Sequence, residues 1–163
     1  MLTRITTFAL IGIDPRRVDV EVDIRPGLPS FTIVGLGDRS VREARERVAA
    51  AVANSGFEFP QKRITVNLAP AGLQKSGPGF DLAIAAGVLA ASGQIPARAL
   101  ERLAVFGELS LSGELRPGRG VLAVAEGTVR EGLEGLVVPR ERAADAALVE
   151  GLAFDRERLA AAC

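Results

Sequence analysis

The sequence QKSGPGFDLAIAAGVLAASG, residues 74–93, joins a glycine-rich turn to a helix that is apolar on nearly all sides. A helix without a polar face is predicted to lie in the centre of a domain. We therefore expect a loop over 71–79 and a buried helix from about Phe80 to Ala91. Because glycine-rich turns before helices also attract phosphates, the stretch is a candidate functional site as well as a core element.

Strands are predicted on both sides of this helix, over 3–13, 18–24, 30–36 and 63–70. The segment VDVEVDI, 18–24, alternates strictly, with its acidic residues facing water. The turn at Pro26-Gly27 predicts that the first three strands form an antiparallel meander. Further along, two short strands are expected within 103–115, with a turn near Ser112-Gly113, and another strand over 135–139.

Helices are predicted between these strands. Ser40 and Glu43 have the spacing of a capping box, which predicts a helix start, and Gly56 is the expected C-cap. Further helices are expected over 121–132 and within the segment RERAADAALVEGLAF, 140–154. The order of elements predicts a single α+β domain over residues 1–163.

The composition excludes several kinds of site. The 163 residues contain no histidine, so Ser-His-Asp and Cys-His catalysis and zinc sites with histidine ligands are excluded. The only cysteine, Cys163, cannot form an internal disulfide. No apolar run reaches the roughly 18 residues of a membrane span, and the N-terminus is typical of a strand, so we expect a cytoplasmic protein without membrane contact. No metal site is expected.

Charge and aromatic content give no general signal for nucleic acid. The formal net charge is +0, so no overall basic field is expected. The seven phenylalanines are the only aromatic residues, which argues against a base-stacking platform.

The glycine-rich loop does not match a nucleotide motif. In a P-loop, Lys and Ser or Thr follow the last glycine, whereas here Lys75 and Ser76 precede Gly77 and Gly79. One interpretation is a tight turn with Asp81 as the helix cap, and turn chemistry favours it. The other is an anion-binding loop with Lys75 exposed. A Ser76–Lys75 nucleophile is weakly supported, because neighbouring side chains diverge.

Two longer stretches resemble the protease domain of Lon. The stretch from Gln74 to Pro96 is similar to the Lon segment P-K-D-G-P-S-A-G and the buried helix after it. The segment FGELSLSGELRPGRGVLAVAEGTVREGLEGLVVPRE is similar to T-G-E-I-T-L-R-G-x-V-L-P-I-G-G-L-K-E-K-L. The alignment places the Lon catalytic serine on Gly79 and the catalytic lysine on Leu122, so it implies the Lon scaffold without Lon peptidase chemistry.

Nearly the whole chain resembles the N-terminal domain of the magnesium-chelatase-like AAA+ family that includes ComM and YifB. The stretches that carry this resemblance are FTIVGLGDRSVREARERV and NLAPAGLQKSGPGFDLAIA. The resemblance implies a two-layer βαβ superfold with a left-handed crossover, shared with Lon protease domains and GHMP kinases. It also implies an AAA+ ATPase module downstream, so we expect this chain to be a fragment that does not hydrolyse ATP.

For the full-length protein, the resemblance implies a hexameric ring that binds ATP and Mg²⁺. It also implies DNA as a partner, with branch-migration helicase activity in natural transformation. We expect no cofactor and no small-molecule substrate for this chain, whose role would be ring assembly and DNA handling. The residues expected to contact DNA phosphates are loop cations: Arg16, Arg17, Lys62, Arg63, Arg116, Arg119 and also Lys75.

Two enzymatic alternatives stay open from the sequence. A GHMP-type small-molecule kinase would share the superfold, but its loop favours P-x-x-x-G-L-x-S-S-A, which is not the text of this loop. A Lon-type Ser-Lys peptidase is disfavoured, because Gly79 and Leu122 replace the dyad.

Overall fold

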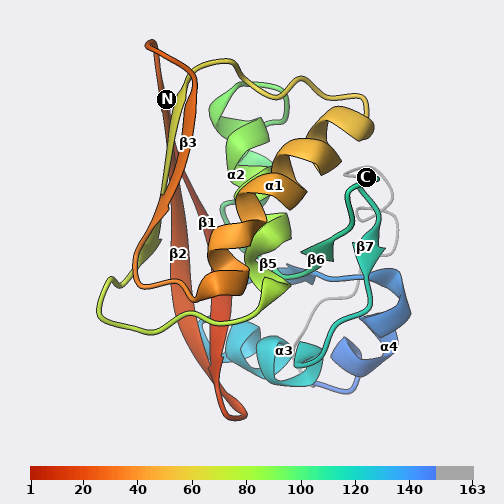
Figure 1. Ribbon diagram of the computed structural model, residues 1–163. Helices are drawn as coiled ribbons and strands as arrows, with labels where there is room; N and C mark the ends of the chain where they lie inside the picture. Colours follow the sequence, from red (N-terminus) through yellow and green to blue (C-terminus); the bar gives the residue numbers. More distant parts are fainter. Residues whose placement is uncertain (150–163) are drawn as a thin grey trace.

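The computed structural model describes residues 1–149 and forms a six-stranded sheet in the order β3-β4-β2-β1-β5-β8 (Figure 1). The strands of this sheet are β1 (Leu2–Ile11), β2 (Asp14–Arg25), β3 (Ser30–Val34), β4 (Arg63–Ala69), β5 (Leu103–Val105) and β8 (Gly135–Val137). A separate two-stranded sheet contains β6 (Glu108–Leu109) and β7 (Leu115–Arg116). The predicted turn at Ser112-Gly113 lies between these two strands.

The α-helices are α1 (Arg39–Asn54), α2 (Asp81–Ala91), α3 (Val121–Arg130) and α4 (Ala143–Ala146). Short 3₁₀ helices lie at Pro78–Phe80, Ala97–Leu100 and Arg140–Arg142. The predicted last helix is therefore short where it is seen, and its remainder lies outside the described residues, as does Cys163. Within residues 1–149, no helix is both long enough and apolar enough to cross a membrane.

The first two strands form a long antiparallel hairpin, paired from Leu2 with Asp23 to Ile11 with Asp14. The valines that alternate in β2 are fully buried, which confirms the predicted half-buried strand. The acidic residues between them lie on the opposite, more exposed face. This hairpin is the centre of the sheet.

The predicted three-stranded meander is wrong. β3 does not pair with β2; it pairs in parallel with β4, which lies between them and is antiparallel to β2. After the Pro26–Pro29 segment, the chain leaves the position next to β2 free and forms β3 one position further out. The connection through α1 then brings β4 into the position between them. Local turn residues indicated where the strands end, but the position of β4 depends on contacts from distant sequence.

The connection from β3 through α1 to β4 is left-handed. In β3, Phe31 and Ile33 pack against the core on the face that α1 covers, whereas the Ser30 N–H points to β4 and donates to the Lys62 carbonyl at 3.2 Å. In a strand of L-residues, this places β4 to the left of β3 when the sheet is viewed from the helices with both strands pointing up. In the usual right-handed β-α-β connection, the second strand would lie to the right of the first in this view.

The helices cover the sheet unequally. α1 and α2 lie together on one face and share the main core with β1, β2 and β4 (Figure 1). α2 lies so close to the sheet that a Cβ on Gly87 would be 2.5 Å from Cγ2 of Val22. α3 packs on the other face, at the end of the hairpin, in a second cluster that contains Phe8 and Ala125. The α+β class and the buried central helix are thus confirmed.

The start of α1 corrects the predicted capping box. Asp38 is the N-cap, in an extended conformation, and its Oδ1 accepts the Val41 N–H at 2.8 Å. Ser40 lies inside the first turn, so the Ser40–Glu43 pair is not the cap. The helix ends at Asn54 with Ser55 as C-cap, one residue before the predicted Gly56.

Candidate functional site

A cleft of about 450 Å³ lies at the carboxyl ends of the parallel strands β1 and β5. The loop before α2 and the loop before α3 form two of its walls. Its lining is mainly apolar and glycine-rich, and its charged members are Glu108, Arg119 and Arg142. In sheets with parallel strands, ligands commonly bind beyond the carboxyl ends, so this cleft is the candidate site.

The loop before α2 brings Ser76, Gly77 and Gly79 to the cleft. Ser76 is exposed, and the Gly77 N–H donates to Oδ2 of Asp38 at 3.2 Å. A 3₁₀ turn at Pro78–Phe80 then leads into α2. The stretch therefore forms the predicted tight turn into the buried helix α2, and the anion-binding loop stays a prediction.

Phe106 occupies the space beside Gly79. A Cβ at position 79 would lie 2.5 Å from Cε2 and 2.7 Å from Cζ of Phe106. A side chain at position 79 would therefore require the ring of Phe106 to move. The sequence did not point to Phe106, because this residue follows β5 and is far along the chain from Gly79 in the turn before α2.

Leu122, which takes the place of the Lon lysine in the resemblance, is the second residue of α3. This residue is 46% exposed. The two positions that would carry a Ser-Lys dyad thus hold a glycine packed against an aromatic ring and a leucine. Neither supplies a nucleophile or a base.

Lys75 is buried, which contradicts the expected exposed lysine at the loop. Its ammonium group donates to the Gly35 carbonyl at 2.6 Å and to the Pro70 carbonyl. Its backbone also pairs with the segment before α1, since the Lys75 N–H donates to Leu36 and the Lys75 carbonyl accepts from Asp38. Lys75 therefore joins two loops and is not available to bind DNA.

Replacing Lys75 by Met is expected to lower the free energy of unfolding by about 2 kcal/mol, because the partly buried carbonyls of Gly35 and Pro70 lose a charged donor. Urea denaturation measures this loss. Lys62→Met is the matched control: Lys62 is exposed, so its loss should stay within about 0.5 kcal/mol. Equal losses for the two variants would contradict a structural role for Lys75.

The same lysine predicts a pH effect. Burial lowers the pKa of the Lys75 ammonium group, so the folded state releases the proton at a lower pH than the unfolded chain. Stability should therefore rise with pH from the folded pKa up to the unfolded value of about 10.4. This increment should be missing in Lys75→Met when denaturation is compared over that range.

Asp81 is not the helix cap that the sequence predicts. It is fully buried, and its carboxylate accepts two hydrogen bonds from Arg47 of α1, at 2.7 and 3.0 Å. It also accepts the Leu109 N–H of β6 at 3.1 Å. Burial raises the pKa of Asp81, while the bonds from Arg47 and Leu109 oppose this rise. The carboxylate thus links α1, α2 and β6.

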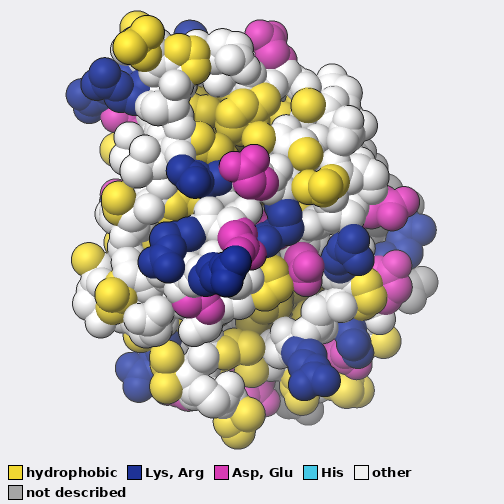
Figure 2. Space-filling view, in the orientation of Figure 1, with side chains coloured by type: hydrophobic (Ala, Val, Ile, Leu, Met, Phe, Trp, Pro, Cys, Tyr) yellow, Lys and Arg dark blue, Asp and Glu magenta, His cyan; other side chains and the backbone are white. Residues whose placement is uncertain are grey.

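The basic residues predicted to contact DNA form three separate pairs. The first pair, Arg16 and Arg17, lies near the start of β2. The second pair lies at the start of β4: Lys62 directly precedes this strand, and Arg63 is opposite Arg25 at the other end of β2. The third pair, Arg116 and Arg119, lies in β7 and beside the cleft. Figure 2 shows basic and acidic side chains intermingled on the face it presents, without a continuous basic patch.

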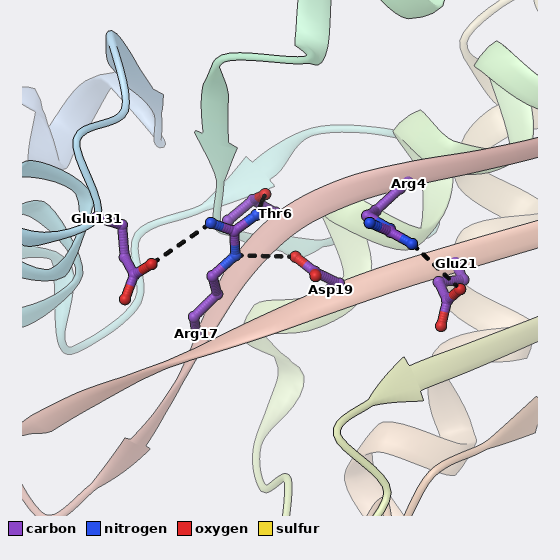
Figure 3. A network of polar contacts seen from close by, with 6 residues as sticks. All are labelled: Arg4, Thr6, Arg17, Asp19, Glu21 and Glu131. Atoms are coloured by element: carbon purple, nitrogen blue, oxygen red, sulfur yellow. Dashed lines mark hydrogen bonds and ion pairs between the residues drawn. The ribbon is translucent and has the colours of Figure 1, made fainter.

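Neighbouring groups hold the first of these pairs. The Arg17 guanidinium donates to Asp19 at 3.0 Å, to Thr6 at 3.3 Å and to Glu131, the residue after α3, at 3.4 Å (Figure 3). Arg16 donates to Asp14 at 2.6 Å. The other four cations are exposed and have no ion pair among residues 1–149: Lys62, Arg63, Arg116 and Arg119.

Comparison with known proteins agrees with the sequence and the fold. The family model described as subunit ChlI of Mg-chelatase matches residues 20–142. The uncharacterized protein YifB of Salmonella typhimurium is 45% identical over 148 residues, which are 91% of this chain and 29% of that protein. Competence protein ComM of Haemophilus influenzae is 43% identical over 141 residues, 86% of this chain and 28% of that protein.

A more distant match is consistent with the resemblance to Lon. Lon protease 2 of Thermus thermophilus is 27% identical over 128 residues, 74% of this chain and 16% of that protein. The chain spans less than a third of the length of YifB and ComM. Because the ChlI model matches well over half of its residues, the chain belongs to the family of subunit ChlI of Mg-chelatase.

Proposed function

We propose that this chain is the non-catalytic N-terminal domain of a magnesium-chelatase-like AAA+ ATPase. In this role it supports assembly of the ATPase ring and guides DNA toward it, in a protein that migrates DNA branches during transformation or recombination. ATP and Mg²⁺ would be bound by the ATPase module and not by this domain. The protein would act in the cytoplasm.

The contact between Gly79 and Phe106 is the observation that carries this proposal. In a domain similar to Lon, a nucleophile at this position would require the ring of Phe106 to move, and Leu122 supplies no base. A domain that keeps the scaffold without the chemistry is suited to binding and assembly. The similarity to competence protein ComM favours DNA as the partner of the whole protein.

The DNA role predicts a specific change in salt dependence. Replacing Arg116 and Arg119 by Ala in the full-length protein should weaken DNA binding and lower the slope of log K against log salt by about 1 per arginine. Fluorescence anisotropy over a salt series measures this slope. Phosphate contacts need exposed cations, and both arginines are exposed.

A control that removes the same charge is Arg98→Ala with Arg102→Ala, two exposed arginines outside the predicted contact set. This control should keep the parental slope. If both double variants change binding equally, or if neither does, Arg116 and Arg119 do not contact DNA. If the full-length protein shows no ATPase activity stimulated by DNA, the proposed function itself fails.

A further inference from the structure

The end of the β1–β2 hairpin carries an apolar tip, formed by Ile11, Gly12 and Ile13. Ile13 is 88% exposed and Ile11 is 48% exposed. The hairpin ladder continues to the pair Ile11–Asp14, so the tip is held by paired strands. Figure 1 shows this end projecting past α3.

An isoleucine is an unusual residue for this turn. Gly12 has a φ of +63° and Ile13 does not have a positive φ, as in a two-residue hairpin loop with glycine first. Such loops favour glycine, asparagine, aspartate or serine, because the second residue is solvated. The turn geometry requires Gly12, but nothing in it requires an exposed branched apolar side chain at position 13.

The cleft beside α2 and α3 is an apolar receptor without an occupant from the described part of the same chain. Phe8, Leu10, Phe106, Val121 and Pro139 contribute apolar side chains to it. Leu10 lies directly before the tip, and the paired strands keep the tip directed past this cleft. The tip of one molecule can therefore reach such a cleft only in another molecule.

We propose that the apolar tip of one copy inserts into the cleft of a neighbouring copy. Two exposed isoleucines match the apolar lining, and the glycine between them adds no side chain to the insertion. Tip and cleft are different surfaces, so the contact is heterologous, and a heterologous contact that closes forms a ring. The inference thus rests on the proposed role in ring assembly and names the surfaces involved.

The two surfaces offer one pair of opposite charges, the carboxylate of Asp14 at the tip and the guanidinium of Arg119 in the cleft. Asp14 flanks the tip, where Arg16 and Arg130 bond to its carboxylate at 2.6 and 3.4 Å, and 43% of its side chain stays accessible. Arg119 and Arg142 line the cleft, and Arg119 has no ion pair among residues 1–149. Opposite charges around an apolar centre are typical of a specific interface and fix its register.

Mixed disulfide cross-linking tests this contact directly. In a Cys163→Ser background, one chain carries Ile13→Cys and a second chain carries Ser76→Cys, an exposed residue of the cleft. We expect a disulfide between the two chains under mild oxidation, seen on a non-reducing gel and mapped by mass spectrometry. The control for random collision uses a chain with Leu28→Cys in place of the Ile13→Cys chain. Leu28 lies in the turn after β2 and is 84% exposed, so its cysteine is equally accessible but is outside the tip.

The proposal is overturned if Ile13→Cys cross-links to Ser76→Cys no better than Leu28→Cys does. It is also overturned if Ile13→Cys forms only symmetric dimers with itself, which would indicate contact between two tips. Neither reaction needs ATP or DNA. A positive cross-link in a protein that lacks DNA-stimulated ATPase activity would therefore reject the proposed function and keep this contact. DNA-stimulated ATPase activity without the cross-link would reject this contact and keep the proposed function.

A second measurement uses the full-length protein with Ile13→Asp. A charge placed in an apolar cleft should raise the dissociation constant of the assembly at least tenfold, measured by analytical ultracentrifugation. Leu28→Asp is the matched control and should assemble like the parent, and circular dichroism establishes that both variants fold. Unchanged assembly of Ile13→Asp overturns the proposal, including the case in which the variant loses only DNA binding.

Discussion

Arg47→Met is expected to lower the free energy of unfolding by about 3–5 kcal/mol, because it leaves the carboxylate of Asp81 buried without its cation. Asp81 has 0% of its side chain exposed and Arg47 has 19%. The pair connects α1 to α2, and the Leu109 N–H extends the connection to β6. Urea denaturation followed by circular dichroism measures the loss.

The control for this variant is Arg39→Met on the same helix. Arg39 bonds to Glu43 at 2.9 Å, but its side chain is 89% exposed, so the pair is solvated. Its removal should cost less than about 0.5 kcal/mol. A similar loss in both variants would mean that burial of Asp81 is not the cause.

Acid should reduce the cost of Arg47→Met. Burial raises the pKa of Asp81, so the folded state binds the proton more tightly than the unfolded chain does. Protonation of Asp81 therefore stabilises the folded state below the unfolded pKa, and this stabilisation is lost as the pH rises through the folded pKa. Without Arg47 to oppose burial, the pKa rises further, and the variant has its largest deficit at neutral pH. The deficit should shrink toward a pH of about 4, where an unfolded Asp titrates.

The variant Arg47→Met with Asp81→Asn separates charge from packing. The amide introduced by Asp81→Asn keeps an acceptor for the Leu109 N–H and has no charge to leave unpaired. The double variant should therefore be more stable than Arg47→Met alone. If Asp81→Asn makes Arg47→Met worse, the loss comes from packing of the Arg47 stem and not from the buried charge.

Periodic patterns allowed most of the elements to be predicted. The alternation in β2 and the apolar helix α2 follow from burial, which a local pattern records. The resemblance to known families implied the left-handed crossover, whereas general topology rules favour the opposite hand. The position of β4 between β2 and β3 was missed, because pairing of distant strands leaves no local signal in one sequence.

The candidate site was harder to predict, for a physical reason that Lys75 and Asp81 illustrate. Charged residues are usually exposed, so Lys75 was expected at the surface and Asp81 at a helix end. Both are buried, because each has partners far along the chain: Gly35 and Pro70 for Lys75, Arg47 for Asp81. The resemblance to Lon placed the Lon nucleophile at Gly79, but nothing in the sequence indicated that the ring of Phe106 lies beside this position.

Gly79→Ser restores the hydroxyl at the position of the Lon nucleophile and is expected to destabilise the domain by about 3 kcal/mol, at the upper end of overpacking costs. The new Cβ would lie 2.5 Å from Cε2 of Phe106. Phe106 is only 8% exposed and packs in the second core cluster, so its ring can move only by giving up contacts or entering the cleft. Gly72→Ser is the control, because a Cβ there meets no atom within 4 Å.

A second background identifies the ring as the cause of this loss. In a chain with Phe106→Ala, the space beside position 79 is free, and Gly79→Ser should cost little relative to that parent. The coupling between the two changes, measured by a double-mutant cycle, should reach a large part of the roughly 3 kcal/mol expected. An equal cost of Gly79→Ser with and without the ring would reject this contact as the reason.

The same contact predicts that the dyad cannot be restored by its two residues alone. The variant Gly79→Ser with Leu122→Lys should not react with a fluorophosphonate serine probe, because the ring of Phe106 occupies the space in which the hydroxyl must be approached. Labelling is read by mass spectrometry, with Ser76 in the parent as a serine that also should not react. Labelling at position 79 while Phe106 is present would show that the scaffold keeps its catalytic geometry, whereas labelling only after Phe106→Ala would identify the ring as the group that closes the site.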